Sequence, residues 1–311
     1  MNKRKLIKRL ALREYLPWSA LLLGWVLVAV ALGLDTATQL ISATLLAGAA
    51  RALTQVNTGR LLRRAGEPDP LAQTSPGYAF KVSIAGLAAG LLFIAFAMGL
   101  LVAASRTVLA HMLLLLAIGL PARYLLVFAG RPRRRIIRFR LSLALSGLAL
   151  LGLAIALDLG WQGAALALAL REWFAFLVVA VSPVKRTSKA ALETPVVGPA
   201  ATPWERVVEA NYVRARRRLA TRTSRLLLAP FIGPLAGLVI RTGRSAGADR
   251  RLAPHVPQSR PALIGAALVL FAGGAMLLMI NRDAWLGLIA CSLLRAAAST
   301  AAAALWSKLR G

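Results

Sequence analysis

The sequence predicts an all-α membrane protein, a polytopic bundle of about eight transmembrane helices with a basic cytoplasmic insert. Of the 311 residues, 58% are hydrophobic, and they gather in runs that approach the roughly 20 residues needed to cross a bilayer. The 39 Lys and Arg residues far outnumber the 11 Asp and Glu residues. The basic residues cluster between the apolar runs, as the positive-inside rule describes for cytoplasmic loops.

A six-helix transmembrane region, 17–182, follows the basic N-terminus at 1–16. This N-terminus imitates a secretory signal, but its apolar run is long and a second run follows almost at once, so we expect a helical hairpin that is not cleaved. Arginine-rich segments at 57–80 and 131–140 mark cytoplasmic loops. The expected spans are 17–34, 37–56, 82–104, 108–130, 141–157 and 163–182.

Two of these spans carry irregular features. Gly86 and Gly90 form a GxxxG pair, which predicts a face where another helix approaches closely. Pro121 interrupts the fourth span, since proline removes a backbone donor and clashes with the preceding turn.

The region 183–261, here called the basic insert, separates the first six spans from the final hairpin and C-terminus at 262–311. The basic insert contains Thr202-Pro203-Trp204-Glu205, which is typical of the start of a helix, and apolar residues follow it at helical spacing. These features predict a basic amphipathic helix in the headgroup layer. Segment 226–240 is roughly 22 Å long as a helix, shorter than the hydrocarbon core of about 30 Å, so we expect it to be re-entrant or interfacial. The last two spans are expected at 262–280 and 284–306, which places both termini in the cytoplasm.

Charged residues lie at membrane depth in several spans. Arg171 and Arg295 fall near the middle of their helices, and each follows a Trp-x-Gly turn by the same distance. Either an internal duplication or the shared Leu/Ala/Gly-rich composition of the helices accounts for this match. A charge at the bilayer centre costs roughly 2.5–3.5 kcal/mol on insertion scales, so we expect both arginines to face the bundle interior. Arg51 and Arg123 lie nearer the cytoplasmic ends, where snorkelling is the simpler interpretation.

Glu172 follows Arg171 directly and is the one acid expected within a span. Adjacent side chains on a helix point about 100° apart, so Glu172 is expected to reach Arg295 or Arg123 on another helix. Two interpretations of Arg123, Arg171, Glu172 and Arg295 stay open: a cavity for an anionic substrate such as a lipid phosphate, or a structural bridge between helices.

Motifs of known catalytic chemistry are not found in the sequence. HExxH, GxSxG, DxxD and Walker A patterns are missing, so we expect neither an enzyme nor a cofactor. Asp35, Asp158 and Asp283 recur at expected outer turns, where aspartate is common for local reasons, and we expect no metal there. His111, His255 and the single Cys291 are too isolated for a metal site.

Two basic runs are candidate surfaces for anionic lipid headgroups, each charge near such a surface being worth about 1 kcal/mol. Aromatic residues are not interleaved with these runs, so nucleic acid is not an expected partner. The residues are Arg133, Arg134, Arg135, Arg216, Arg217 and Arg218.

The segment 159–167, Leu-Gly-Trp-Gln-Gly-Ala-Ala-Leu-Ala, resembles the Gly-x-x-Gly-Ala-Ala-x-Ala turn and helix of the polysaccharide and lipid-linked oligosaccharide flippases, a branch of the MATE-like exporters. The resemblance covers one hairpin, and that family usually has twelve or more helices. It implies a cationic cavity for a lipid-linked anion, which would suit Arg123 and Arg171.

The function expected from these observations is transport or flipping of an anionic lipid-linked substrate across a bacterial-type inner membrane. The alternative is a membrane scaffold or assembly factor whose basic insert binds anionic lipid or a protein partner.

Overall fold

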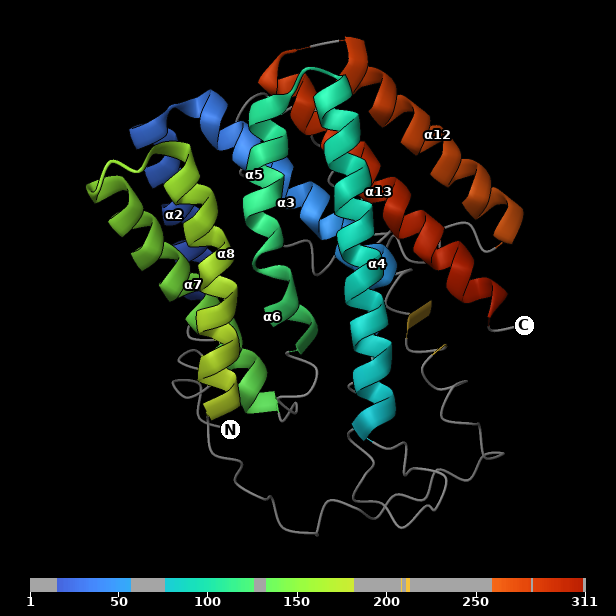
Figure 1. The fold of residues 1–311 in the computed structure, drawn as a ribbon, viewed down its shortest axis with the longest axis horizontal. Helices are drawn as coiled ribbons and strands as arrows, with labels where there is room; N and C mark the ends of the chain where they lie inside the picture. Colours follow the sequence, from blue (N-terminus) through green and yellow to red (C-terminus); the bar gives the residue numbers. More distant parts are fainter. Residues whose placement is uncertain are drawn as a thin grey trace, which may run out of the picture.

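The computed structural model describes residues 16–56, 76–125, 133–181, 208, 211–212, 259–280 and 282–309. Within these ranges the chain is all-helical and contains no strand, which confirms the expected fold class (Figure 1). The principal helices are α2 (Leu16–Leu32), α3 (Leu34–Thr54), α4 (Pro76–Ala103), α5 (Thr107–Ala117), α6 (Leu120–Leu125), α7 (Arg133–Ala156), α8 (Gly160–Val181), α12 (Arg260–Ile280) and α13 (Ala284–Lys308).

Five of the described helices, α4, α7, α8, α12 and α13, are long and apolar enough to cross a membrane. The apolar stretches of α2 and α5 are shorter, and α3 has the length but carries more polar residues. These helices are those of a multi-pass membrane protein, although the expected count of eight spans is not confirmed.

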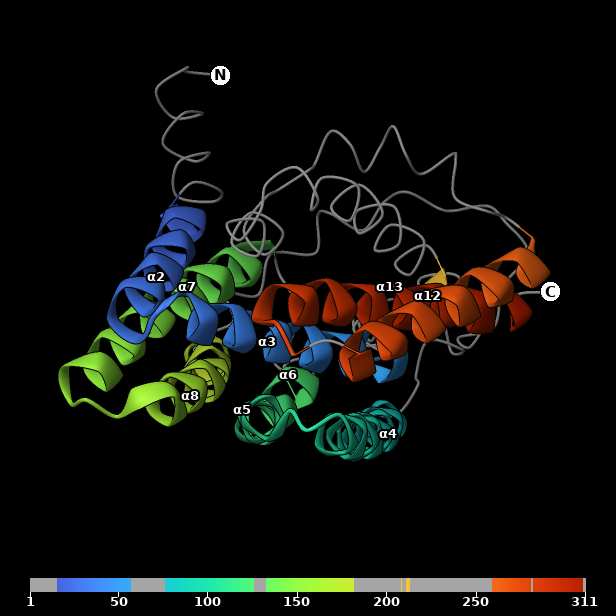
Figure 2. The same ribbon diagram turned by 90° about the horizontal axis from the view of Figure 1, so that it is seen from above.

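Helix α3 is the centre of the bundle. It packs against α13, α5, α4, α2 and α8, and two thirds of its residues are buried (Figure 2). Its buried hydroxyls satisfy themselves locally: Thr38 donates to Leu34 O at 2.8 Å and Ser42 donates to Thr38 O at 2.8 Å. Because these bonds stay within one helix, polar side chains can occupy the core without polar partners on neighbouring helices.

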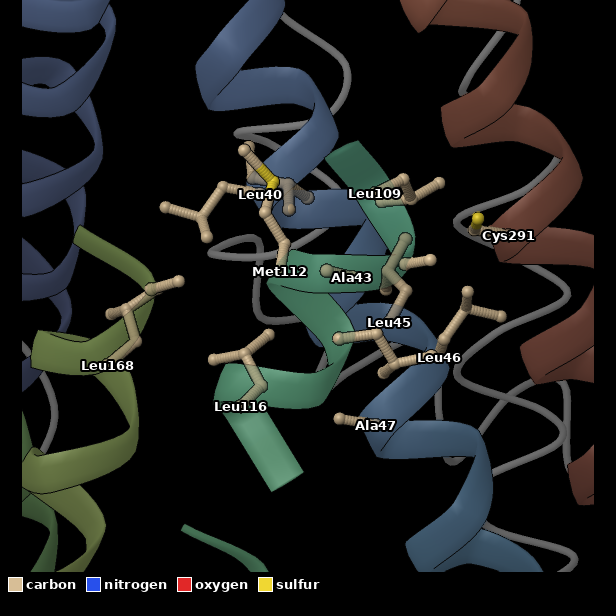
Figure 3. Packing of buried hydrophobic residues seen from close by; sticks show 14 of the residues in the cluster. Leu40, Ala43, Leu45, Leu46, Ala47, Leu109, Met112, Leu116, Leu168 and Cys291 are labelled. Atoms are coloured by element: carbon tan, nitrogen blue, oxygen red, sulfur yellow. The ribbon is translucent and has the colours of Figure 1, made fainter. Parts of the chain in front are cut away.

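The core between α3 and its neighbours is built from interdigitating aliphatic side chains (Figure 3). Leu40 and Leu46 of α3 and Met112 of α5 are fully buried in this core, and Leu40 lies beside Met112. Cys291 of α13 is also fully buried and has no disulfide partner. Burial of a Leu or Met side chain contributes roughly 1.5–3 kcal/mol relative to water, but within a bilayer the comparable gain comes from close packing.

Four hairpin turns lie at the same end of the bundle, the upper end in Figure 1. Gly33 supplies a φ of 87° between α2 and α3, a conformation that glycine adopts without steric cost. At this end the guanidinium of Arg106, before α5, donates to the carbonyl of Asp283 at 3.4 Å. Burial lowers the pKa of Arg106 below its ordinary value, and the charge of Asp283 acts in the opposite direction.

The fourth expected span is broken, as Pro121 predicted. Helix α5 ends at Ala117 and α6 begins at Leu120, with Gly119 N donating to Leu116 O in a tightened turn at 3.1 Å. The indole nitrogen of Trp173 on α8 donates to Ile118 O at 2.9 Å, so a side chain bonds a carbonyl at the break.

The GxxxG face of α4 makes the close approach that the sequence predicted. A methyl group on Gly86 would lie 2.6 Å from the carbonyl oxygen of Thr54 at the end of α3. One on Gly90 would lie 2.8 Å from the hydroxyl of Tyr124 on α6. The Tyr124 hydroxyl also bonds the Thr54 hydroxyl, so the two glycines hold α4 against the ends of α3 and α6.

Between 183 and 258 of the basic insert, the structure describes Val208, Asn211 and Tyr212, and all three are helical and buried. Val208 and Tyr212, one turn apart, pack with Trp306 of α13 and Leu263 of α12. At these residues the apolar side of the expected amphipathic helix is therefore covered by protein and not by lipid. The N-terminal 1–15, the loop 57–75 and the segment 226–240 lie outside the described residues.

Candidate functional site

Helix α8 carries the candidate site at its midpoint. Arg171 and Glu172 are 4% and 8% exposed, the two charged residues among the buried side chains of the described chain. Because α8 is uninterrupted here, its backbone N–H and C=O groups are hydrogen-bonded within the helix, and the side chains alone determine the local polarity.

Glu172 is paired with Arg123 of α6. The Arg123 Nη2 donates to Glu172 Oε1 at 2.8 Å, and its Nε contacts Oε2, so both carboxylate oxygens meet one guanidinium. The other side of this guanidinium lies over the ring of Phe139, 5.0 Å from its centroid. Such a two-point, stacked geometry is specific to arginine and would not be reproduced by lysine.

Gly119, in the break between α5 and α6, permits this pairing. A methyl group there would lie 2.8 Å from Ala169 O and 3.3 Å from Cγ of Glu172. The chain at the break therefore passes directly over α8, which places Arg123, four residues later, beside Glu172.

Arg171 extends in another direction, across α7. A methyl group on Gly147 would lie 3.0 Å from Cδ of Arg171, so the aliphatic part of the Arg171 side chain occupies the space that this glycine leaves open. The Nε of Arg171 is buried and has no hydrogen-bond partner within the described ranges. Arg171 is thus a buried cation whose desolvation is only partly compensated by the adjacent carboxylate.

A small cavity of about 30 Å³ joins these groups. Arg51, on the same face of α3 as Thr44 and Ala47, supplies a third guanidinium. Its lining is Thr44, Ala47, Arg51, Leu116, Gly119, Leu120, Arg123, Leu168, Arg171 and Glu172. Arg51, Arg123, Arg171 and Glu172 are here called the cationic cluster, in which three guanidiniums and one carboxylate line the same cavity.

Arg51 was expected to snorkel toward the cytoplasm, yet it lines this cavity. The signal that could have revealed it is its spacing from Thr44 and Ala47, since residues seven and four positions apart share one helical face. Arg123 was also expected to snorkel, but its guanidinium binds Glu172 instead.

Arg295 does not line the cavity. Its guanidinium packs on α3, with Cζ 3.0 Å from where a methyl group on Gly48 would lie. Helix α3 lies between α8 and α13 (Figure 2), so the interior position expected for Arg295 is a different one from that of Arg171. Of the two partners expected for Glu172, the structure selects Arg123.

The remaining candidates of the sequence have other placements. Asp283 caps α13, its Oδ1 accepting from the backbone nitrogens of Trp285 at 2.6 Å and Leu286 at 3.2 Å, which gives it a local structural role. No group of three metal-ligating side chains occurs in the part of the chain that the structure describes. Arg133, Arg134 and Arg135 begin α7 without described side chains, and Arg216, Arg217 and Arg218 lie outside the described residues.

The size of the cavity limits its present contents. A water needs at least about 10–15 Å³ of such space, so this cavity has room for one or two waters but not for a phosphate ester. Three guanidiniums beside it could together neutralise an anion if the helices separated.

Comparison with protein-family models, curated proteins and solved structures finds no match for this chain.

Proposed function

We propose that this protein is a transporter or flippase-like protein for an anionic lipid-linked substrate, whose phosphate or pyrophosphate group binds at the cationic cluster. The observation that carries the proposal is the buried Arg171, whose Nε has no hydrogen-bond partner within the described residues, beside a small cavity that Arg51, Arg123 and Glu172 also line. A fully structural bridge needs one arginine for one carboxylate; this site has three arginines.

The excess arginines have an energetic cost that a bound anion would offset. Desolvating a guanidinium costs several kcal/mol unless charge and hydrogen bonds compensate it. Among the described residues, Glu172 is the opposite charge that acts on Arg171, and the positive charge of Arg123 opposes it. A phosphate offers several acceptor oxygens and matches the planar fork of arginine.

The structure corresponds to a closed state in this proposal, since the cavity holds no more than a water or two. The break between α5 and α6 is the natural place for opening, because the helix is already interrupted there and Arg123 moves with α6. Such broken helices often form substrate sites near the midplane of transporters.

The topology belongs to the same proposal. Eight spans, with both termini in the cytoplasm of a bacterial-type inner membrane, would put the four hairpin turns outside and the basic insert inside. The basic runs, including those of the insert, would then contact anionic headgroups. We propose no catalytic or cofactor chemistry and no nucleic acid partner, in agreement with the flippase resemblance of segment 159–167.

A scaffold or assembly factor is the second candidate. The closed cavity and the two-point Arg123–Glu172 contact favour it, since both describe a tightly joined bundle. In that case the insert, which docks on α13 through Val208 and Tyr212, would bind anionic lipid or a protein partner with its basic side.

Thiol accessibility separates the two candidates. In a Cys291→Ala background, Leu168→Cys places a thiol in the cavity, and Leu170→Cys places one at the same depth, 36% exposed on the outside of the bundle. Transport predicts that a membrane-impermeant reagent labels the first and not the second, because thiolates form only where water reaches. Polyprenyl pyrophosphate should protect Leu168→Cys, and Arg171→Gln should abolish this protection.

An unreactive Leu168→Cys, in folded protein reconstituted in liposomes with or without polyprenyl pyrophosphate, would contradict transport through this site. That result would transfer the functional assignment to the scaffold candidate and its basic insert.

A further inference from the structure

A second cavity, of about 210 Å³, lies on the other side of α3 from the cationic cluster. Helices α3 and α13 form its floor through residues such as Leu46 and Ala298, and α4 and α12 form its walls through Phe93 and Ala267. We call this cavity the apolar groove. Every described side chain that lines it is Leu, Phe or Ala.

The groove exists because small residues replace large ones along one face of α13. Ala297, Ala298 and Ala301 contribute no side chain beyond Cβ, so the space between α4 and α12 is not filled. Helix α12 packs mainly on α13, with Gly274 leaving room for Leu294, and does not close against α4. The gap is therefore set by the backbone arrangement and not by one side-chain rotamer.

The groove is continuous with the lipid-facing surface. Phe96 on α4 and Leu268 on α12 line it and are 59% and 63% exposed, and Phe271 is 40% exposed. Only 28% and 17% of the spanning windows of α4 and α12 are buried. A cavity lined almost entirely by apolar atoms does not hold ordered water, and one of about 150 Å³ is large enough to take up benzene.

We propose that the apolar groove binds one acyl chain of a membrane phospholipid. The surroundings of α4 and α12 are hydrocarbon, and a chain that enters between them replaces empty space by close contacts with α3 and α13. The proposal does not rest on the function assigned to the cationic cluster. The cluster uses the face of α3 that carries Ala47 and Arg51, whereas the groove uses the face that carries Leu46 and Leu53.

The test is photolabelling in nanodiscs made of phosphatidylglycerol with a diazirine in its acyl chain. Adducts are mapped by peptide mass spectrometry in wild type, in Ala267→Phe, and in Ala272→Phe as a matched control. Ala272 is on the same helix, exposed and outside the groove, so the control adds the same ring facing lipid. Ala298→Phe fills the groove from its floor and serves as a second blocking variant.

Wild type and Ala272→Phe are expected to carry adducts on Phe93, Leu46 or Leu294, which lie in the depth of the groove. Both blocking variants should lose these adducts by about tenfold, as overpacking excludes the chain. Labelling of the exposed Leu153 on α7 reports the surrounding bilayer and should not change.

Absence of adducts on all of Phe93, Leu46 and Leu294 in wild type would overturn the proposal, whatever the variants do. Unchanged floor labelling in Ala267→Phe and Ala298→Phe would also overturn it. So would displacement of the label by an equimolar polyprenyl phosphate, which would assign the groove to a prenyl chain.

Discussion

At the scale of single residues, two neighbours on one helix have different environments. Glu172 is held at two points by Arg123, whereas Arg171 lies over Gly147 with its Nε unbonded within the described chain. The 100° between adjacent helical residues explains why they separate. One of them has a structural partner, and the other contributes unbalanced charge to the cavity.

Removing the carboxylate tests this division. Glu172→Gln removes the carboxylate that Arg123 contacts at two points, and we expect it to lower the free energy of unfolding by about 3–5 kcal/mol. Arg123→Gln should also destabilise, and the double variant should be less destabilised than the sum by about 1–3 kcal/mol. Unfolding in detergent micelles, followed by tryptophan fluorescence, measures all three.

A double variant whose loss equals the sum of the single losses would show that the two side chains are not coupled. The site would then need a different account of how Glu172 is stabilised.

Sequence reasoning reached part of this site. The depth of Arg171 and Glu172 follows from counting along an apolar run, and the helical angle excluded their pairing with each other. The choice between Arg123 and Arg295 could not be made, because it depends on which helices are neighbours. Arg51 was missed since its position near a helix end admitted snorkelling.

At the scale of elements, the break between α5 and α6 determines where Arg123 lies. Pro121 accounts for the interruption, and Gly119 for the close passage over α8. Pro121 predicted the interruption, but the sequence did not predict that α8 lies directly beneath it. A glycine such as Gly119 indicates only that some backbone can approach closely, and not which helix does so.

Gly119→Ala is expected to destabilise the protein by about 1–3 kcal/mol, since the new methyl group would lie 2.8 Å from Ala169 O. Gly152→Ala on α7 is the control, because nothing lies within 4 Å of a methyl group there. The measurement is micellar unfolding of both variants. Equal stability of the two would mean that the break does not press on α8 as described.

At the scale of the whole molecule, apolar runs predicted nearly every helix, but some helices begin up to about two turns before the expected residue. The expected span 82–104 is α4 at Pro76–Ala103, and the expected span 141–157 is α7 at Arg133–Ala156. Apolarity finds the membrane core, but helices continue past it into polar sequence. Three-dimensional neighbours, such as α3 between α8 and α13, carry no signal in one sequence.

The position of the four hairpin turns at one end makes a topological prediction. Cysteines placed at Asp35, Thr107, Leu159 and Arg282, in the Cys291→Ala background, are exposed and belong to these four turns. All four should react with an impermeant thiol reagent added to intact cells. Cysteines at 60 and 131, in the expected cytoplasmic loops, should react only after the membrane is opened.

Alternation of reactivity among the four turns would contradict the eight-span arrangement. It would mean that at least one hairpin does not cross the membrane as a pair of helices.

The composition of α3 has a consequence for biogenesis. This central helix is not among the helices apolar enough to cross a membrane by themselves, and it carries Thr38, Ser42, Thr44 and Arg51. The helix that covers much of it, α13, leaves the ribosome well after α3, because α4, α5, α6, α7, α8 and α12 lie between them in the chain. During synthesis α3 therefore needs a substitute for α13, either its hairpin partner α2 or the insertion machinery, and the core around α3 is completed only when α13 arrives.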